Sequence, residues 1–189
     1  MPSSQIDITR AAVIELGDAI PTSLSDDQDS VAVANQIYPQ VKTDLLSKAP
    51  WRFAAKKITL SLVVTAPLNE WTQQFDMPTD FVRIIRVYPD QAYEIFGLRI
   101  YANTTSLACD YVHDCSESLM PPYFVTLFTY ELAERMSRAI TGADSDKQTL
   151  RDRRRFAFAE AMSADAMQRP NTIMVQSPFI DVRRSTRSR

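Results

Sequence analysis

Three residues near the middle of the chain, Cys109, His113 and Cys115, have side chains that commonly bind zinc. All three occupy odd positions, so they would share one face of an extended strand. At about 3.3 Å per residue, the two cysteines of such a strand lie roughly 20 Å apart, too far for a shared tetrahedral ion or a disulfide. We therefore predict no metal site and two reduced thiols, which is typical of assembly in a cytoplasm.

No catalytic signature accompanies these residues. His113 is the single histidine of the chain, and no nucleophile lies at a recognisable spacing from it. The three glycines, Gly17, Gly97 and Gly142, are scattered, whereas phosphate-binding loops need clustered glycines so that backbone amides can approach the ligand. We predict that the protein is not an enzyme and requires no cofactor.

Arginine side chains form a first charged cluster in the last third of the chain. This cluster comprises Arg151, Arg153, Arg154 and Arg155. A charge run on a helix is usually a solvated face, and contact with a partner is the alternative interpretation. A small DNA-binding or regulatory protein would also use such residues, but no helix-turn-helix or basic-zipper pattern surrounds them.

The C-terminal segment 169–189 has a charge opposite to that of the remaining chain. It contains five arginines against Asp181, a balance of +4, so the other residues carry -6 of the net charge of -2. Its apolar and basic side chains follow no helical period. One interpretation is that the segment becomes ordered when it docks on a partner, and the alternative is a frayed terminus. The candidate docking residues are Ile173, Val175, Phe179, Ile180, Arg183, Arg184, Arg187 and Arg189.

Four helices are predicted from apolar residues at steps of three and four. Asp7 is the expected cap of the first helix, which ends at Gly17, and Asp29 or Ser30 that of the second, which extends to about 49 with a kink at Pro39. The third helix spans 121–140. The fourth begins after Gly142, is capped by Ser145 or Asp146, extends to about 167 and carries Ala157, Ala161 and Ala164 on one side.

Between the helix pairs the hydrophobic period changes to two. One strand is expected around 58–64, with Ile58, Leu60, Leu62 and Val64 on one side. Further strands are expected at 71–77, 81–88, on both sides of Gly97 and at 107–113, which makes about six strands in an antiparallel meander.

These elements predict an α+β fold, in which a four-helix bundle-like domain carries an inserted small antiparallel β-sheet or barrel and an extended C-terminal tail. The expected ranges are 1–49 for the N-terminal helices, 50–119 for the β-rich insertion, 120–168 for the C-terminal helix pair and 169–189 for the tail. The predicted core residues are Trp51, Phe53, Phe124, Phe128 and Leu132. No apolar run is long enough for a membrane span and the N-terminus does not resemble a signal peptide, so no membrane association is expected.

Three short sequence segments, taken in their order along the chain, resemble those of one family of viral proteins. They are Leu45-Leu46 followed by 49–54 (APWRFA), the phrase 77–84 (MPTDFVRI), and Phe124 through Leu132-Ala133. Together they resemble the head-tail connector (adaptor) proteins of tailed bacteriophages, a family that includes podophage tail tubular protein A. The resemblance covers roughly residues 6–167, and its phrases are structural rather than catalytic.

The resemblance implies a structural virion protein that is assembled in the host bacterial cytoplasm and is located in the neck between head and tail. It implies a ring of about twelve copies, a central channel through which double-stranded DNA passes, and contact with a downstream neck, tail tube or nozzle protein. It also implies that the C-terminal tail reaches into the portal protein above the ring.

Overall fold

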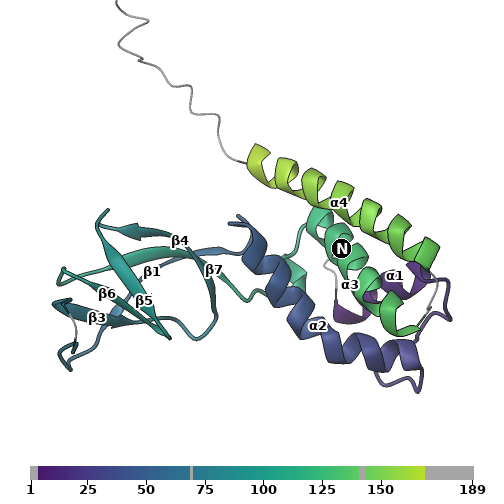
Figure 1. Cartoon of the computed structure of the whole chain (residues 1–189), viewed down its shortest axis with the longest axis horizontal. Coiled ribbons are helices and arrows are strands. Elements are labelled where there is room, and N and C mark those ends of the chain that lie inside the picture. The colour runs from purple at the N-terminus through teal and green to yellow at the C-terminus, as the bar shows by residue number, and fades with distance from the viewer. Residues whose placement is uncertain (1–3, 69, 141–143, 169–189) are drawn as a thin grey trace, which may run out of the picture.

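The computed structural model describes residues 4–68, 70–140 and 144–168, and places helices and strands in two adjoining halves (Figure 1). The helical half contains α1 (Gln5–Glu15), α2 (Asp29–Lys48), α3 (Pro122–Ile140) and α4 (Asp144–Met167). The β half follows α2 and leads through a short 3-10 helix, η1 (Glu117–Leu119), to α3. Its strands are β1 (Ala55–Thr59), β2 (Ser61–Leu62), β3 (Gln73–Asp76), β4 (Phe81–Tyr88), β5 (Tyr93–Phe96), β6 (Arg99–Ala102) and β7 (Ala108–His113).

Helix α1 begins with a capping box at Ser4. The Ser4 hydroxyl accepts a hydrogen bond from the Asp7 amide, while the Asp7 carboxylate accepts one from the Ser4 amide at 3.0 Å. The prediction that Asp7 caps this helix is therefore wrong, because Asp7 lies inside the first turn. At the other end Gly17, with φ +71°, allows Asp18 to donate to the Val13 carbonyl and close the helix.

Helix α2 begins and ends differently from α1. Its N-cap is Gln28, whose side chain makes no capping hydrogen bond, so neither Asp29 nor Ser30 is the cap. Pro39 lies within the continuous helix, and the kink expected there stays a prediction. Ala49 adopts an extended conformation just before Pro50, as expected of a residue that precedes proline.

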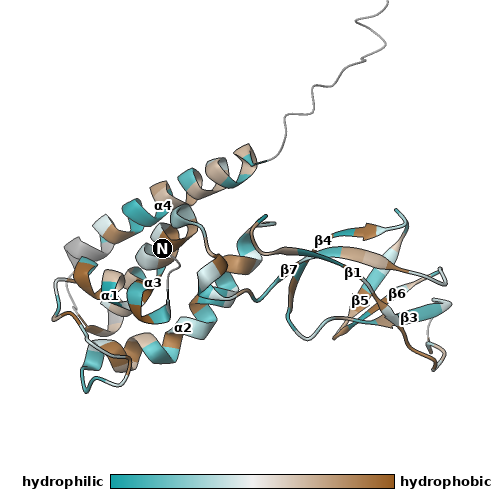
Figure 2. Ribbon diagram, turned by 180° about the vertical axis from the view of Figure 1, so that it is seen from behind, coloured by the Kyte–Doolittle hydropathy of each residue, from teal (hydrophilic) through white to brown (hydrophobic). Residues whose placement is uncertain are grey.

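Helix α3 is central to the helical half because it packs against α1, α2 and α4. Its residues Phe124, Phe128 and Leu132 are fully buried one turn apart, and Ala157 and Ala161 of α4 are buried in the same core. Hydrophobic and hydrophilic residues alternate along α4 in Figure 2, as expected of a helix with one buried side. The predicted stop at Gly142 lies outside the described residues, and α4 already begins at Asp144, so Ser145 and Asp146 are inside its first turn rather than its cap.

Trp51 lies in the short segment that connects α2 to β1. The indole is fully buried, donates from Nε1 to the Leu45 carbonyl at 2.8 Å, and meets the Phe124 ring edge-on with centroids 5.1 Å apart. Phe53 is half-buried and its ring lies 4.7 Å from that of Phe124. This packing secures the end of α2 immediately before β1 starts.

The strands form two antiparallel sheets rather than one meander, and no barrel closes among the described strands. The order is β1-β7-β4 in the first sheet and β2-β3-β6-β5 in the second. The meander prediction is wrong because strands that are distant in sequence pair: β7 lies between β1 and β4, and β6 lies between β3 and β5. Gly97, with φ +60°, forms the predicted turn between β5 and β6.

The single strand expected around 58–64 is also two strands. The chain passes from the first sheet to the second at Leu60, which is buried between them, while Ile58, Leu62 and Val64 are exposed. The alternating pattern continues through this change of sheet, so it gives no signal of the break. No helix within the described ranges is long and apolar enough to cross a membrane.

Candidate functional site

The predicted arginine cluster lies along α4, where three of its four members form ion pairs with other helices. Arg151 lies 3.2 Å from Glu134 of α3, and Arg153 lies 2.6 Å from Glu15 of α1. Arg154 donates to Glu131 at 3.2 Å and lies 2.7 Å from Glu134 as an ion pair without hydrogen-bond alignment. Arg151, Arg153 and Arg155 are exposed, so this cluster is a solvated helix face on which three of the four charges are paired within the chain. Within the described part of the chain, Arg155 alone of these four makes no ion pair.

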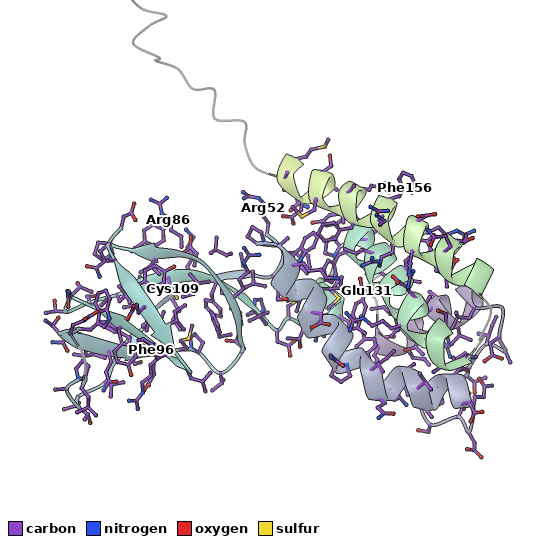
Figure 3. The ribbon with its side chains drawn as sticks, in the orientation of Figure 1. Arg52, Arg86, Phe96, Cys109, Glu131 and Phe156 are labelled. Carbon is purple, nitrogen blue, oxygen red and sulfur yellow. The ribbon has the colours of Figure 1, made fainter. Side chains whose placement is uncertain are left out.

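Glu131 is the centre of this network (Figure 3). Its side chain is 5% exposed and accepts hydrogen bonds from Lys48 of α2 at 3.0 Å and from Arg135 at 3.0 Å, in addition to Arg154. Arg135 also reaches Asp44 of α2 at 2.7 Å. One buried carboxylate thus connects α2, α3 and α4. No local sequence pattern indicates this arrangement, because the partners are on separate helices.

The electrostatics of the network favour the charged forms. Burial alone would raise the pKa of Glu131, but the Lys48 hydrogen bond and the nearby Arg135 and Arg154 charges outweigh it and hold that pKa below its usual value of 4.5. Burial likewise opposes the charge on Arg135, and the carboxylates of Asp44 and Glu131 raise its pKa. Permanently ionised groups that bind each other do not transfer protons near neutral pH, so the network is suited to holding helices together.

The residues considered for zinc lie in different surroundings. Cys109 is buried in the core between the two sheets, and Cys115 in the core of the helical half. Both thiols are free, and burial raises the pKa of Cys109 to about 11, which makes it a poor nucleophile at neutral pH. The Nδ1 atom of His113 lies 2.7 Å from the carbonyl oxygen of Ala54, so the imidazole contacts the backbone immediately before β1.

The first sheet, β1-β7-β4, has basic residues on both edge strands. On β1, Lys56 pairs with Asp80 at 2.8 Å and Lys57 with Asp110 at 3.3 Å. On β4, Arg86 lies 3.8 Å from Asp90, and Arg83 donates to the Ser47 carbonyl of α2 at 3.1 Å. Charged side chains on edge strands disfavour pairing with another chain.

The second sheet, β2-β3-β6-β5, has edges of another kind, which sequence reasoning missed. Neither β2 nor β5 contains a lysine or an arginine. Large apolar side chains are instead exposed at both edges, at Leu62 and Val64 on the β2 side and at Tyr93, Ile95, Phe96 and Leu98 on the β5 side. Figure 3 shows Phe96 at this end of the molecule, far from the ion-pair network. The available signal was the absence of lysine and arginine in these two short strands.

Another exposed apolar side chain lies on α4. Phe156 is 77% exposed on the side of α4 away from α3 (Figure 3), whereas Phe158 is half-buried beside Trp51. The predicted docking residues of the C-terminal tail, from Ile173 to Arg189, lie outside the described residues. No protein-family model matches this chain, and no curated protein matches it.

Proposed function

We propose that this protein is a structural virion component, a head-tail connector or adaptor of a tailed bacteriophage. In this proposal, copies of the chain form a ring between the portal and the tail or next neck component, DNA passes through the central channel, and the C-terminal tail docks on the portal. It acts as an assembly part rather than as an enzyme.

The observation that carries this proposal is the way the β half interrupts the helical half. Helices α1 and α2 precede the strands and α3 and α4 follow them, yet α3 packs against α1, α2 and α4 around one core. This is consistent with the bundle-like domain and β-rich insertion implied by the three sequence phrases. Trp51, within the first phrase, and Phe124 and Leu132, within the third, are fully buried, so the resemblance rests on residues with structural roles.

The distribution of charge also supports passage of DNA without retention. Lysine and arginine contacts with phosphates provide most of the non-specific affinity for DNA. In this protein Arg151, Arg153 and Arg154 are engaged by glutamates. The alternative function, a DNA-binding or regulatory protein that uses the arginine clusters, is less well supported because its main candidates already have partners.

Deletion of residues 170–189 tests this function directly. The truncated protein should keep its thermal transition nearly unchanged, because α4 is complete before the deletion. It should lose binding to the portal protein encoded by the same genome, as measured by co-sedimentation.

In the full-length chain, replacing Phe179 and Ile180 with serine should weaken binding at every salt concentration. Neutralising Arg183, Arg184, Arg187 and Arg189 should slow association mainly at low salt.

Two results would contradict this proposal. Portal binding by the truncated protein at the wild-type level would remove the tail from the docking contact. A severe drop in melting temperature after truncation would instead make the tail part of the folded core. DNA affinity that persists after tail removal would favour the alternative function.

A further inference from the structure

Within the described strands, β2 and β5 are the terminal strands of the second sheet. A terminal strand presents backbone N–H and C=O groups on its outer side that another strand can satisfy. Monomeric proteins commonly block such edges with lysine, proline or an inward-pointing charge. The first sheet follows that rule with Lys56 and Lys57 on one edge and Arg83 and Arg86 on the other. The edge strands β2 and β5 of the second sheet contain no lysine, arginine or proline, and only their short length, two and four residues, limits pairing.

The side chains at the two edges of the second sheet are apolar and accessible. Leu62 on β2 is 47% exposed and Ile95 on β5 is 44% exposed. They belong to the same row across the sheet, because Leu62 pairs with Phe75, Phe75 with Ile100, and Ile100 with Ile95. Phe75 and Ile100 inside this row are fully buried, so the row is covered in its middle and open at both ends.

The single charged residue of these two strands is held away from the edge. Glu94 accepts a hydrogen bond through Oε2 from the Trp71 indole at 2.9 Å, and it pairs in register with Tyr101 of β6. Its carboxylate is thus directed across the face of the sheet. The β5 edge consequently has no free charge to oppose an incoming strand.

The strand directions make the two edges complementary to each other. Each neighbouring pair, β2 with β3, β3 with β6 and β6 with β5, is antiparallel, so β5 runs opposite to β2. A second copy in the same orientation would therefore place its β2 antiparallel to β5 of the first copy. The Val63 amide also donates to the Gln74 carbonyl at 2.9 Å, which extends the pairing of the β2 segment beyond its two residues.

We infer that the β2 edge of one copy of this chain pairs with the β5 edge of a second copy, so that the second sheet continues from subunit to subunit. A strand from a different protein would cover one edge and leave the other open. Pairing between copies satisfies both edges with one repeated contact and buries Leu62 of one copy beside Ile95 of the next. Such a head-to-tail contact between identical subunits is heterologous. It closes into a ring when the rotation that relates one subunit to the next is a whole fraction of a full turn.

This inference rests on the proposed ring of identical subunits and identifies the surfaces that would form it. It requires no ion pair and predicts association that is insensitive to salt, because the contact consists of backbone hydrogen bonds and apolar side chains. The arginine network on α4 is not used and remains inside each subunit.

Lysine substitutions on the two edges test the inference on the isolated protein. Ile95→Lys and Leu62→Lys should each weaken self-association of the full chain at least about tenfold, measured by sedimentation velocity over a concentration series. Ile58→Lys is the matched control, since Ile58 is 40% exposed on an edge strand of the first sheet. The control should assemble like the wild type.

Mixing the two edge variants separates the inferred contact from other forms of association. Each variant keeps one intact edge, so an equimolar mixture should form a heterodimer and stop there, at a concentration where each variant alone is monomeric. A variant that failed to fold could not form this heterodimer. Phe96→Lys, at a 53% exposed position of β5, is a second β5 variant that should behave like Ile95→Lys.

Several results would overturn the inference. They are a wild-type chain that stays monomeric at the highest soluble concentration, edge variants that assemble like the wild type, and dimers of Leu62→Lys alone, which would indicate β5–β5 pairing. These outcomes are distinct from a failure of the proposed function. Edge-dependent rings that never bind the portal would contradict only the connector role, and portal-bound rings that tolerate both substitutions would contradict only this contact.

Discussion

The two halves of this chain stabilise themselves in different ways. In the helical half, α3 is surrounded by α1, α2 and α4. Trp51, Phe124 and Phe128 form a buried aromatic cluster there, and the ion pairs around Glu131 add to the contacts between the helices. In the β half, the core between the sheets is smaller, and the second sheet ends on both sides in exposed apolar side chains.

This difference predicts which substitutions change folding and which change association. In the helical half Glu131 and Glu134 are paired with basic side chains of the same chain, whereas the second sheet presents the outer edges of β2 and β5 at the far end of the molecule (Figure 1). Substitutions in the helical core should therefore change the free energy of unfolding, and substitutions on the sheet edges should change association.

The largest effect is expected for Trp51→Ala. Removal of this fully buried indole should lower the free energy of unfolding by about 3 to 5 kcal/mol, because it leaves a cavity and loses the hydrogen bond to Leu45. Urea unfolding followed by circular dichroism measures the change. A variant that unfolds like the wild type but fails to oligomerise would show that Trp51 belongs to an interface. It would contradict the expectation that substitutions in the helical core change stability rather than association.

A smaller effect is expected for Glu131→Gln. The change leaves Lys48, Arg135 and Arg154 close together without their shared carboxylate, and should cost about 2 kcal/mol of stability. Glu160→Gln is the matched control, since Glu160 is exposed on α4, and it should change stability by less than about 0.5 kcal/mol. Equal effects of the two substitutions would show that the network contributes nothing.

The smallest effect concerns pH. Because the pKa of Glu131 is lower in the folded protein than its usual 4.5, its stabilising contribution is complete above that value and is lost as the pH falls through the folded pKa. Asp7, Asp26 and Asp80 also have lowered pKa values and act in the same direction. Unfolding measured between about pH 3 and pH 7 should therefore show a weaker acid dependence for Glu131→Gln than for the wild type. Identical slopes would contradict the assigned role of Glu131.

Much of the fold could be predicted from local sequence patterns. The apolar steps in α2 and α3, Ala49 before Pro50 and the turn at Gly97 report on contacts within one element, where period and backbone conformation are sufficient. The order of the strands could not be predicted in this way. The change of sheet at Leu60 leaves the alternating pattern intact, and the position of β7 between β1 and β4 depends on long-range pairing.

The candidate sites were less predictable than the fold. The charge run on α4 was visible in the sequence, but its partners Glu15, Glu131 and Glu134 lie on other helices, so the ion pairs could not be seen. The sheet edges were missed for a related reason. Exposure of Leu62 and Ile95 follows from which strands are terminal in a sheet, and that depends on the complete strand order.

Electron microscopy of the full-length chain mixed with its portal protein tests the central claim most directly. We expect hollow rings, with a layer of additional density attached to one face of the portal and a central channel wide enough for double-stranded DNA. Portal particles that remain without such a layer at saturating concentrations of the folded chain would contradict the connector role.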